Sequence, residues 1–406
     1  MALKKIMLII MDGLGDRPNN KLGGKTPLES AYIPNMNRLV ENGIGGMMYS
    51  VDQGTVCGSD TSHLSILGYD PVKYYTGRGP FEAMGLGIMV RQSDVSFRAN
   101  FATRNEHNII IDRRAGRLDE DPGDLCKALS MEIDGIEFIV KNGVEHRAAL
   151  VMRGNKLSDK ISDSDPHSVG KAPGTIVPTA PEGKFTADVL NKFLAKSRVI
   201  LENHPFNKKR ISEGKLPANE LLLRGAGITP DINSFQSMFG MSGAYAVGIP
   251  MIRGLANLIG LEEIKIQGIT GSVDTNYKGK IKGAVEGLAK RDFVLVNVKA
   301  PDVAAHDKNP ILKREVLERV DEAMAPLLDI MEDTVIVMTG DHSTSSESGE
   351  HTGDPVPIAI ASNGIRTNGC TRFDEKNSGI SSFRIYSRNV MQYALQLSDR
   401  AEKYGA

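Results

Sequence analysis

Few features of the 406-residue sequence point to a secreted, membrane-bound or nucleic-acid-binding protein. Its 3 cysteines, Cys57, Cys126 and Cys370, lie far apart and form no CxxC pair, which argues against a disulfide framework or a cysteine-rich zinc site. No apolar run approaches ~18 residues, the length that a membrane-spanning helix needs. The apolar run at 6–11 is too short for a signal peptide. We therefore expect a cytoplasmic protein that does not enter a membrane.

Charge and nucleotide-binding motifs are sparse as well. The formal net charge is −1, so the chain lacks the basic excess of a general nucleic-acid binder. A small anionic substrate is compatible with this balance, because a local cluster of Arg and Lys does not require a basic chain. No GxxxxGKS or GxxxxGKT loop occurs, and Pro18 occupies the last position of the GxGxxG frame that begins at Gly13.

Strand and helix patterns alternate towards both ends of the chain. Short apolar runs predict strands at 6–11, 46–51, 293–298 and 334–338. Helical patterns occupy 34–42, 61–67, 252–259 and 312–330. Alternating β and α units predict an α/β fold with a mostly parallel sheet and helices on its faces.

The middle of the chain has a different character, with denser charged and turn-forming residues. Weak strand patterns at 95–103 and 148–152 lie between such stretches, and a Pro-, Gly- and Thr-rich loop is predicted at 170–184. This pattern indicates an inserted α+β domain. We expect a core domain formed by 1–90 and 232–406, and an inserted cap domain at 91–231.

Three carboxylates follow three of the predicted strands: Asp12, Asp302 and Asp341. Ligands bind at the carboxyl ends of strands in parallel sheets, so one topology could bring these acids together. His306 lies i+4 from Asp302, which places both on one face of a helical turn. His342 adjoins Asp341, and His351 lies in the loop that follows.

Mixed imidazole and carboxylate groups suit a divalent ion such as Mn²⁺ or Zn²⁺, and a pair of such ions can clamp a phosphoryl group during its transfer. Taken singly, each strand-end Asp could instead be a helix cap or a turn former. The joint pattern favours a metal centre.

Ser59, at the predicted start of a helix, is a candidate nucleophile that a bound cation would activate. The alternative is that Ser59 is a simple N-cap.

Distinctive segments occur over nearly the whole chain: MDGLGDRP (11–18), GSDTSHLSILGYDP (58–71), TGRGPFEAMGLG (76–87), FRANFATR (97–104), DRRAGR (112–117), SDSDPH (162–167), LPANELLLRGAG (216–227), KAPDVAAHD (299–307), TGDHST (339–344) and EHTGDPVP (350–357). Together they resemble the archaeal type of 2,3-bisphosphoglycerate-independent phosphoglycerate mutase, in the alkaline phosphatase superfamily. The resemblance implies an alkaline-phosphatase-like core with an inserted cap domain.

The resemblance further implies two divalent ions, with Mn²⁺ first and Zn²⁺, Co²⁺ or Mg²⁺ as alternatives. One ion would be held by Asp302, His306 and His351, and the other by Asp12, Ser59, Asp341 and His342. Ser59 would carry phosphate transiently while 3-phosphoglycerate and 2-phosphoglycerate interconvert in glycolysis and gluconeogenesis. The family uses no 2,3-bisphosphoglycerate cofactor.

A mutase must hold glycerate and exclude water, which suits a closing cap domain whose arginines bind the carboxylate. The candidates are Arg114, Arg224, Arg117, Arg113 and Arg98. Asp163 and Asp165 are candidate proton shuttles, and Lys299 is a candidate phosphate contact. Each of these residues has an alternative role as a surface ion pair, turn residue or solvated side chain. The competing functions are a metal-dependent phosphatase, a phosphopentomutase-like enzyme, and a protein without enzymatic activity.

Overall fold

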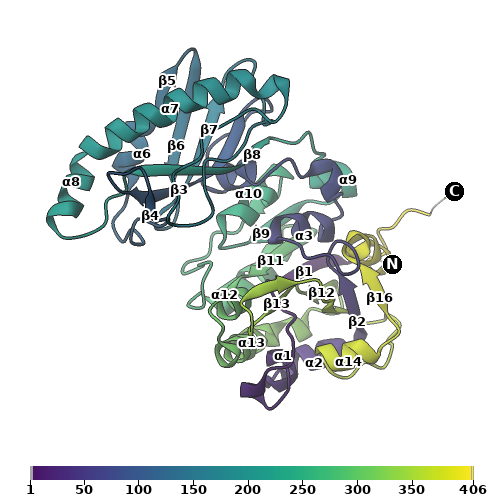
Figure 1. Cartoon of the computed structure of the whole chain (residues 1–406). Coiled ribbons are helices and arrows are strands. Elements are labelled where there is room, and N and C mark those ends of the chain that lie inside the picture. Colours follow the sequence, from purple (N-terminus) through teal and green to yellow (C-terminus); the bar gives the residue numbers. More distant parts are fainter. Residues whose placement is uncertain (1–2, 404, 406) are drawn as a thin grey trace. The chain divides into compact units, whose positions relative to one another are not determined.

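A computed structural model describes residues 3–403 and 405, and the chain divides into two compact units. Unit 1 comprises Met1–Lys73 and Asn233–Ala406, and unit 2 comprises Tyr74–Ile232 (Figure 1). Unit 2 begins earlier than the boundary predicted at residue 91. Helix α5 (Gly79–Gly85) explains the difference, because it packs against strands β3 (Val95–Arg104) and β8 (Glu220–Ile228) of unit 2.

An eight-stranded sheet forms the centre of unit 1, with the order β10-β9-β11-β1-β12-β15-β2-β16. Strand β1 (Lys5–Met11) pairs in parallel with β11 (Phe293–Val298) and with β12 (Thr334–Thr339). Strand β15 (Val356–Ala361) pairs antiparallel with both of its neighbours. The outer strands are β9 (Gly243–Ala246), β10 (Glu262–Glu263), β2 (Gly43–Tyr49) and β16 (Arg384–Tyr386). The prediction of a mostly parallel sheet is confirmed.

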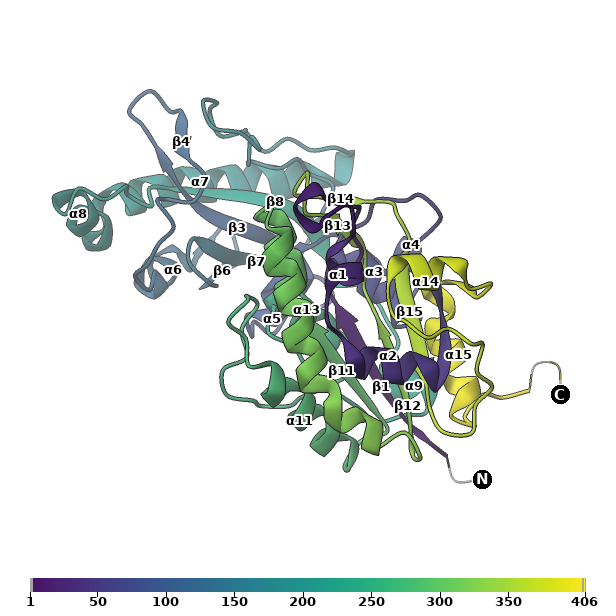
Figure 2. The ribbon, with the colours of Figure 1, turned by 90° about the horizontal axis from the view of Figure 1, so that it is seen from below.

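Both faces of this sheet are covered. Met7, Ile9 and Met11 of β1 pack into a core with helices α2 (Pro34–Glu41), α11 (Tyr277–Leu288) and α13 (Pro310–Met324). These three helices lie on the same side of the sheet (Figure 2). The alternate residues Ile6, Leu8 and Ile10 are also fully buried, so the opposite face is covered too.

Two predicted elements of unit 1 differ from the structure. The helix predicted at 312–330 ends as α13 at Met324 and continues as a 3-10 helix at Ala325–Asp329, because Pro326 cannot donate a backbone hydrogen bond. The strand predicted at 46–51 is β2 at Gly43–Tyr49. Its early glycines allow close strand packing: a Cβ at Gly43 would lie 2.2 Å from the Ile360 carbonyl oxygen.

Unit 2 contains an antiparallel sheet of the order β4-β3-β7-β6-β5, with β8 paired to β3. The remaining strands are β4 (Ile110–Asp112), β5 (Met131–Ile133), β6 (Ile136–Asn142) and β7 (Arg147–Arg153). Helices α6 (Gly123–Leu129) and α7 (Lys184–Asn203) enclose a hydrophobic core against one face. The sequence analysis did not predict α7, although Val189, Leu190, Phe193 and Leu194 have helical spacing and are buried. No helix of the described residues is long and apolar enough to span a bilayer.

Candidate metal centre and nucleophile

The parallel pairing of β11, β1 and β12 brings three acids to one edge of the sheet. Asp12 follows β1 directly, and its amide donates to the Val298 carbonyl at the end of β11. Asp302 lies in helix α12 (Ala300–His306), which follows β11, and Asp341 follows β12. All three carboxylates are fully buried. Residues from both ends of unit 1 therefore meet at one point.

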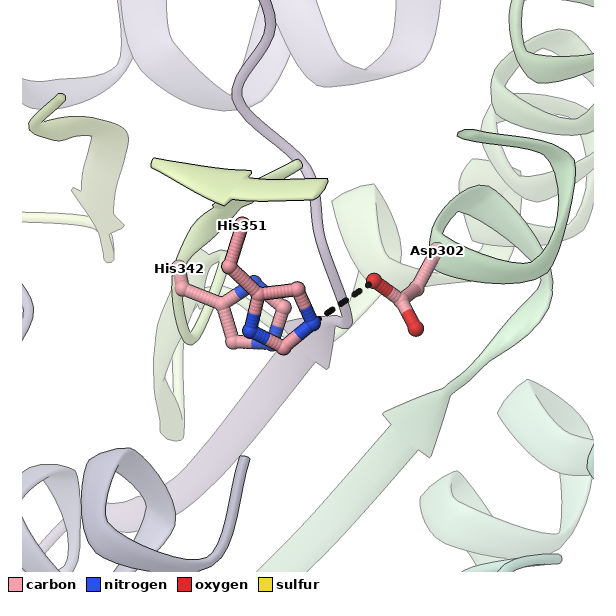
Figure 3. A group of neighbouring side chains, drawn as sticks. All are labelled: Asp302, His342 and His351. Carbon is pink, nitrogen blue, oxygen red and sulfur yellow. Dashed lines mark ion pairs between the residues drawn. The ribbon is translucent and has the colours of Figure 1, made fainter. Parts of the chain in front are cut away.

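Histidines complete two groups of possible metal ligands. Asp302, His342 and His351 form one group (Figure 3), and Asp12, Asp341 and His342 form the other. Within each group, the candidate ligand atoms lie within 4.8 Å of one another. His306 is next to the first group, with Nε2 3.3 Å from Asp302 Oδ2. The six residues that the sequence pattern predicted are thus brought together, and His342 belongs to both groups.

Hydrogen bonds fix the orientation of the three imidazoles. His306 Nδ1 bonds the Gly349 carbonyl at 2.7 Å, and His351 Nδ1 bonds the Cys57 carbonyl at 2.8 Å. A carbonyl oxygen can only accept, so each Nδ1 carries the proton and each Nε2 lone pair is left for a ligand. His342 Nδ1 faces the Thr344 hydroxyl at 3.1 Å.

Thr344 settles the tautomer of His342. Its hydroxyl donates to Asp302 Oδ1 at 2.7 Å, so it accepts from His342 Nδ1. All three Nε2 atoms consequently face the carboxylates with free lone pairs, the arrangement that metal-ligating histidines adopt. The sequence analysis missed Thr344. Its position two residues after His342 on strand β13 (Ser343–Ser345), opposite His351 in β14 (Glu350–Thr352), was the available signal.

The charge of this cluster requires cations. Burial lowers the pKa of His342 to about 4, so the ring is neutral at physiological pH. Lys299 lies 2.8 Å from Asp12 Oδ1 and 2.6 Å from Asp302 Oδ2. Burial opposes its charge, but Asp12 and Asp302 raise the pKa of Lys299. Burial and then Asp341 raise the pKa of Asp12 well above its usual value, which is the expected strain when buried acids lack enough positive charge.

Two carboxylate oxygens support the same conclusion. Asp12 Oδ2 and Asp341 Oδ2 are buried and accept no hydrogen bond from the described residues. Buried acceptors of this kind are costly unless a partner is supplied. Carboxylate oxygens and imidazole nitrogens together suit a divalent ion, so the residues present fit a metal centre.

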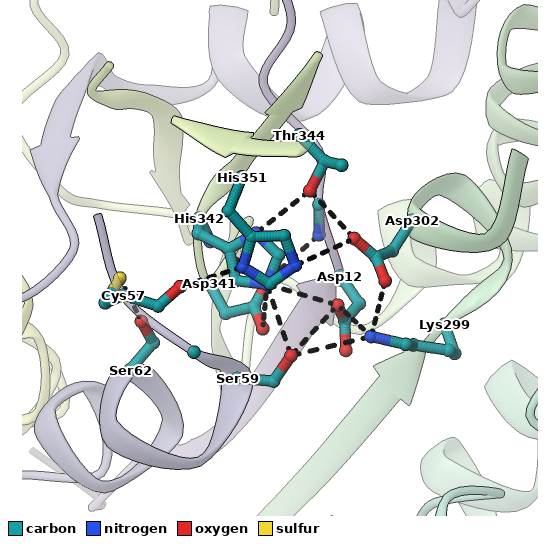
Figure 4. Close-up of polar contacts among 12 residues, drawn as sticks. Asp12, Cys57, Ser59, Ser62, Lys299, Asp302, Asp341, His342, Thr344 and His351 are labelled. Carbon is teal, nitrogen blue, oxygen red and sulfur yellow. Dashed lines mark hydrogen bonds and ion pairs between the residues drawn. The ribbon is translucent and has the colours of Figure 1, made fainter. Parts of the chain in front are cut away.

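Ser59 is the first residue of helix α3 (Ser59–Ile66), and the N-cap position belongs to Gly58. The interpretation of Ser59 as an N-cap is therefore wrong. Its Oγ lies 3.3 Å from Asp12 Oδ1, 3.2 Å from His342 Nε2 and 3.5 Å from Lys299 Nζ (Figure 4). The hydroxyl faces the carboxylate and imidazole groups from a helix N-terminus, where an anion is favoured.

A buried ion pair holds the loops of this centre together. Lys313 of α13 and Asp16 are 2.9 Å apart, and their side chains are 0% and 1% exposed. Lys313 Nζ also donates to the carbonyls of Gly15 and Thr344. The pair thus joins the loop after β1 to the strand that carries Thr344. No pattern in the sequence marks Asp16 and Lys313 as partners.

In unit 2, two of the predicted arginines, Arg98 and Arg224, lie on neighbouring strands, and the other three lie in the turn after β4. On β3, Val95, Phe97, Ala99 and Phe101 enter the hydrophobic core, and Arg98 points to the other face. Arg98 is in register with Arg224 of β8. Burial, and then the charge of Arg78, lower the pKa of Arg98 to about 9. Burial also lowers the pKa of Arg224.

The face around Arg98 contains polar atoms without hydrogen-bond partners among the described residues. Arg98 Nε, Asn100 Oδ1 and His146 Nδ1 are buried and lack hydrogen bonds among the described residues. Burial, and then Arg147, lower the pKa of His146 to about 4. These features are typical of a site for an anionic ligand. Asn100 and His146 were not predicted from the sequence, although the alternation of polar and apolar residues in β3 places Asn100 on the same face as Arg98.

The other predicted residues of unit 2 have different surroundings. Arg113 forms two hydrogen bonds to Asp165, at 3.1 and 2.6 Å, so these two side chains satisfy each other. Asp163 accepts from the Gly225 amide at 3.0 Å. Arg114 is exposed, and its charge contributes to lowering the pKa of His146. Arg117 is exposed as well, and its side chain has no hydrogen bond or ion pair within the described residues.

Comparison with known proteins places these observations in a family. Residues 41–207 match the sequence model of the family described as 2,3-bisphosphoglycerate-independent phosphoglycerate mutase. The chain is 49% identical over 404 residues to the protein of that name from Thermoplasma volcanium, covering 100% of this chain and 99% of the relative. It is 50% identical to the Thermoplasma acidophilum protein of that name, with 100% of both chains covered.

Solved structures agree in fold. A cofactor-independent phosphoglycerate mutase from Thermoplasma acidophilum is similar at a TM-score of 0.75 and 46% identity, covering 98% of this chain and 100% of that one. A protein from Pyrococcus horikoshii is similar at a TM-score of 0.88 and 37% identity, covering 100% of both chains.

Proposed function

The chain belongs to the family of 2,3-bisphosphoglycerate-independent phosphoglycerate mutases, and we propose that it interconverts 3-phosphoglycerate and 2-phosphoglycerate by passing the phosphate through Ser59. The observation that supports this route most directly is the placement of Ser59 Oγ within 3.5 Å of Asp12, His342 and Lys299. A nucleophile needs that combination of an activating group and a positive charge for the transferred phosphate.

The proposed ligand sets follow the two sides of this cluster. Asp302, His306 and His351 would hold one divalent ion, and Asp12, Ser59, Asp341 and His342 would hold the other. We propose Mn²⁺, with Zn²⁺, Co²⁺ and Mg²⁺ as alternatives, because mixed nitrogen and oxygen ligands accept each of them. When bound, the ions supply positive charge to the phosphoryl oxygens and favour the Ser59 alkoxide.

The reaction then has two matched halves. Ser59 Oγ loses its proton and bonds to phosphorus, while the bond from phosphorus to the substrate oxygen breaks and that oxygen takes a proton. In the second half, the other glycerate hydroxyl loses its proton and bonds to phosphorus, while the bond from phosphorus to Ser59 Oγ breaks and Ser59 Oγ takes a proton. Lys299 Nζ would hold the phosphoryl group in both halves. Water must stay out, because it would release the phosphate.

The arginine-rich face of unit 2 is proposed to bind the glycerate carboxylate. Arg98 and Arg224 carry the strongest case, because they are adjacent, partly desolvated and close to a further arginine, Arg78, whose charge lowers the pKa of both. A carboxylate would relieve this repulsion and accept bidentate hydrogen bonds. Asp163 is the better proton shuttle, since Asp165 is occupied by Arg113. Asp165 and Arg113 would position this face, and Arg114 would add charge at its edge.

The product decides between the competing functions. We expect the purified protein to convert 3-phosphoglycerate to 2-phosphoglycerate without added 2,3-bisphosphoglycerate, releasing little free phosphate. The two phosphoglycerate isomers can be distinguished by NMR, and free phosphate can be measured in the same samples. Stoichiometric phosphate release without the isomer would identify a phosphatase. Activity restricted to a pentose phosphate would identify a phosphopentomutase-like enzyme.

Substitution of Arg98 by methionine tests the carboxylate site. Loss of a charged hydrogen bond costs about 1.5–3 kcal/mol, so the KM for 3-phosphoglycerate should rise roughly 10- to 100-fold. The protein should stay folded, because Glu82, which lies 3.9 Å from Arg98, keeps its ion pair with Arg78 at 3.0 Å. The matched control is Arg117→Met, because the Arg117 side chain is exposed and has no hydrogen bond or ion pair within the described residues. An unchanged KM in Arg98→Met would exclude Arg98 from substrate binding.

A further inference from the structure

His63 occupies a position beside the nucleophile that none of the proposed roles uses. It lies one helical turn after Ser59 in α3 and is 0% exposed. Its Nδ1 is 2.7 Å from the Ser59 carbonyl oxygen. That oxygen can only accept, so Nδ1 carries the proton of the ring. Nε2 then has a lone pair, and the Asn297 side-chain amide lies 3.1 Å from it. Asn297 Nδ2 donates this second bond.

The second bond excludes His63 as a metal ligand in this arrangement. Its Nδ1 donates to the Ser59 carbonyl, and the Nδ1 atom lies 3.5 Å from Asp341 Oδ2. Its Nε2 lone pair is used by Asn297. Neither nitrogen can offer a lone pair to a cation among the carboxylates, in contrast to His306, His342 and His351. Among the described residues, the Ser59 hydroxyl has hydrogen-bond partners in Asp12, His342 and Lys299 but not in His63, so His63 acts on the peptide rather than on the reacting atom.

Asn297 is itself fixed in the centre of the sheet. It is 0% exposed on β11, in register with Ile10 of β1. Its backbone oxygen accepts from the buried Lys280 Nζ of α11 at 2.8 Å. The next residue, Val298, accepts from the Asp12 amide at 2.9 Å. The segment that holds His63 therefore also holds Asp12, a neighbour of the Ser59 hydroxyl.

We propose that His63, oriented by Asn297, is a positioning residue that fixes the first turn of α3 to strand β11 and so sets the distances from Ser59 Oγ to Asp12, His342 and Lys299. This inference rests on the proposed role of Ser59 as nucleophile. Without the His63 bond, the N-terminal turn of a short helix is free to shift. A displacement of about 1 Å at a reacting group can cost on the order of 100-fold in rate.

The test compares two substitutions at position 63 in the metal-loaded, full-length protein. His63→Leu removes both hydrogen bonds, and we expect kcat for 3-phosphoglycerate to fall on the order of 100-fold while KM changes less than about three-fold. His63→Asn can place an amide N–H where Nδ1 lies, and it should recover at least about ten-fold of this loss. Metal content by elemental analysis should match the wild type in both variants.

Ser65→Ala is the matched control, because Ser65 is buried on the same helix and bonds Ser387 Oγ at 2.6 Å, away from Ser59. Its kcat should stay within about two-fold of the wild-type value. If His63→Leu does not fold, Asn297→Leu removes the orienting donor instead, and the same selective loss of kcat is expected.

Three results would overturn the inference: an unchanged kcat in the folded His63→Leu or Asn297→Leu protein, a loss of bound metal in His63→Leu, or no recovery in His63→Asn. Metal loss would make His63 a ligand. A wild-type protein without mutase activity would instead reject the proposed function, so the two failures are distinguishable.

Discussion

Replacement of Ser59 by alanine is expected to abolish the mutase activity, with kcat falling by on the order of 10⁴-fold or more. No other hydroxyl can take over, because among the described residues only Ser59 Oγ hydrogen-bonds with Asp12 Oδ1, His342 Nε2 and Lys299 Nζ together. The free energy of unfolding should change little, since Gly58 rather than Ser59 is the N-cap of α3. Conversion of 3-phosphoglycerate to 2-phosphoglycerate is the measurement.

Ser62→Ala provides the control for this experiment. Ser62 lies in the same helix turn and bonds Cys57 Sγ at 2.9 Å, so its removal tests general disturbance of the helix. It should keep most of the activity. A second measurement is acid-quenched protein after incubation with labelled substrate, which should carry phosphate on Ser59 in the wild type only. Retention of activity within ten-fold in Ser59→Ala would reject the phosphoserine route.

Removal of divalent metal is expected to have the second largest effect. Chelation should reduce mutase activity below about 1%, because three buried carboxylates then face one lysine charge and the phosphoryl group loses its positive surroundings. The thermal unfolding midpoint should fall as well, since a ligand that binds only the native state stabilises it. Activity and unfolding are measured on the same metal-free sample.

Addition of single metals then identifies the ion. We expect Mn²⁺ to restore activity and to raise the unfolding midpoint. Zn²⁺, Co²⁺ and Mg²⁺ are compared with it at equal concentration. Asp302→Asn is the matched variant: it keeps the shape of the side chain but weakens one site, so higher metal concentrations should be required. Full activity in protein shown by elemental analysis to contain no divalent metal would contradict the proposed centre.

The fold of unit 1 was predictable because its strands are continuous apolar runs. The runs at 6–11, 293–298 and 334–338 correspond to β1, β11 and β12, and each is followed by one of the three candidate ligand acids. A strand buried on both faces needs such a run, so its position is readable locally. The spacing of Asp302 and His306 also predicted a helical turn, which is α12.

Other features depend on contacts between distant residues and left no local pattern. His342 belongs to both groups of candidate ligands. Its position depends on the hydrogen bond with Thr344 and on the pairing of β13 with β14, the strand that contains His351. The pairing of Arg113 with Asp165 joins two loops whose sequences resemble ordinary turns. The start of unit 2 at Tyr74 is set by the packing of α5 on β3 and β8, which residues 79–85 alone do not reveal. Tertiary packing, rather than propensity, decides each of these.

The insertion of unit 2 into unit 1 has a consequence for biosynthesis. Strand β1 ends at Met11, but its two partners begin at Phe293 and Thr334. On the ribosome, the contiguous segment Tyr74–Ile232 is synthesised before β11 and β12, the two partners of β1. Unit 2 can therefore fold while β1 is still unpaired. Residues 6–11 are all fully buried in the native protein, so the nascent chain displays a strand suited to chaperone binding or aggregation during that time. Chains released before Asp341 is synthesised would lack both a complete sheet and the catalytic centre.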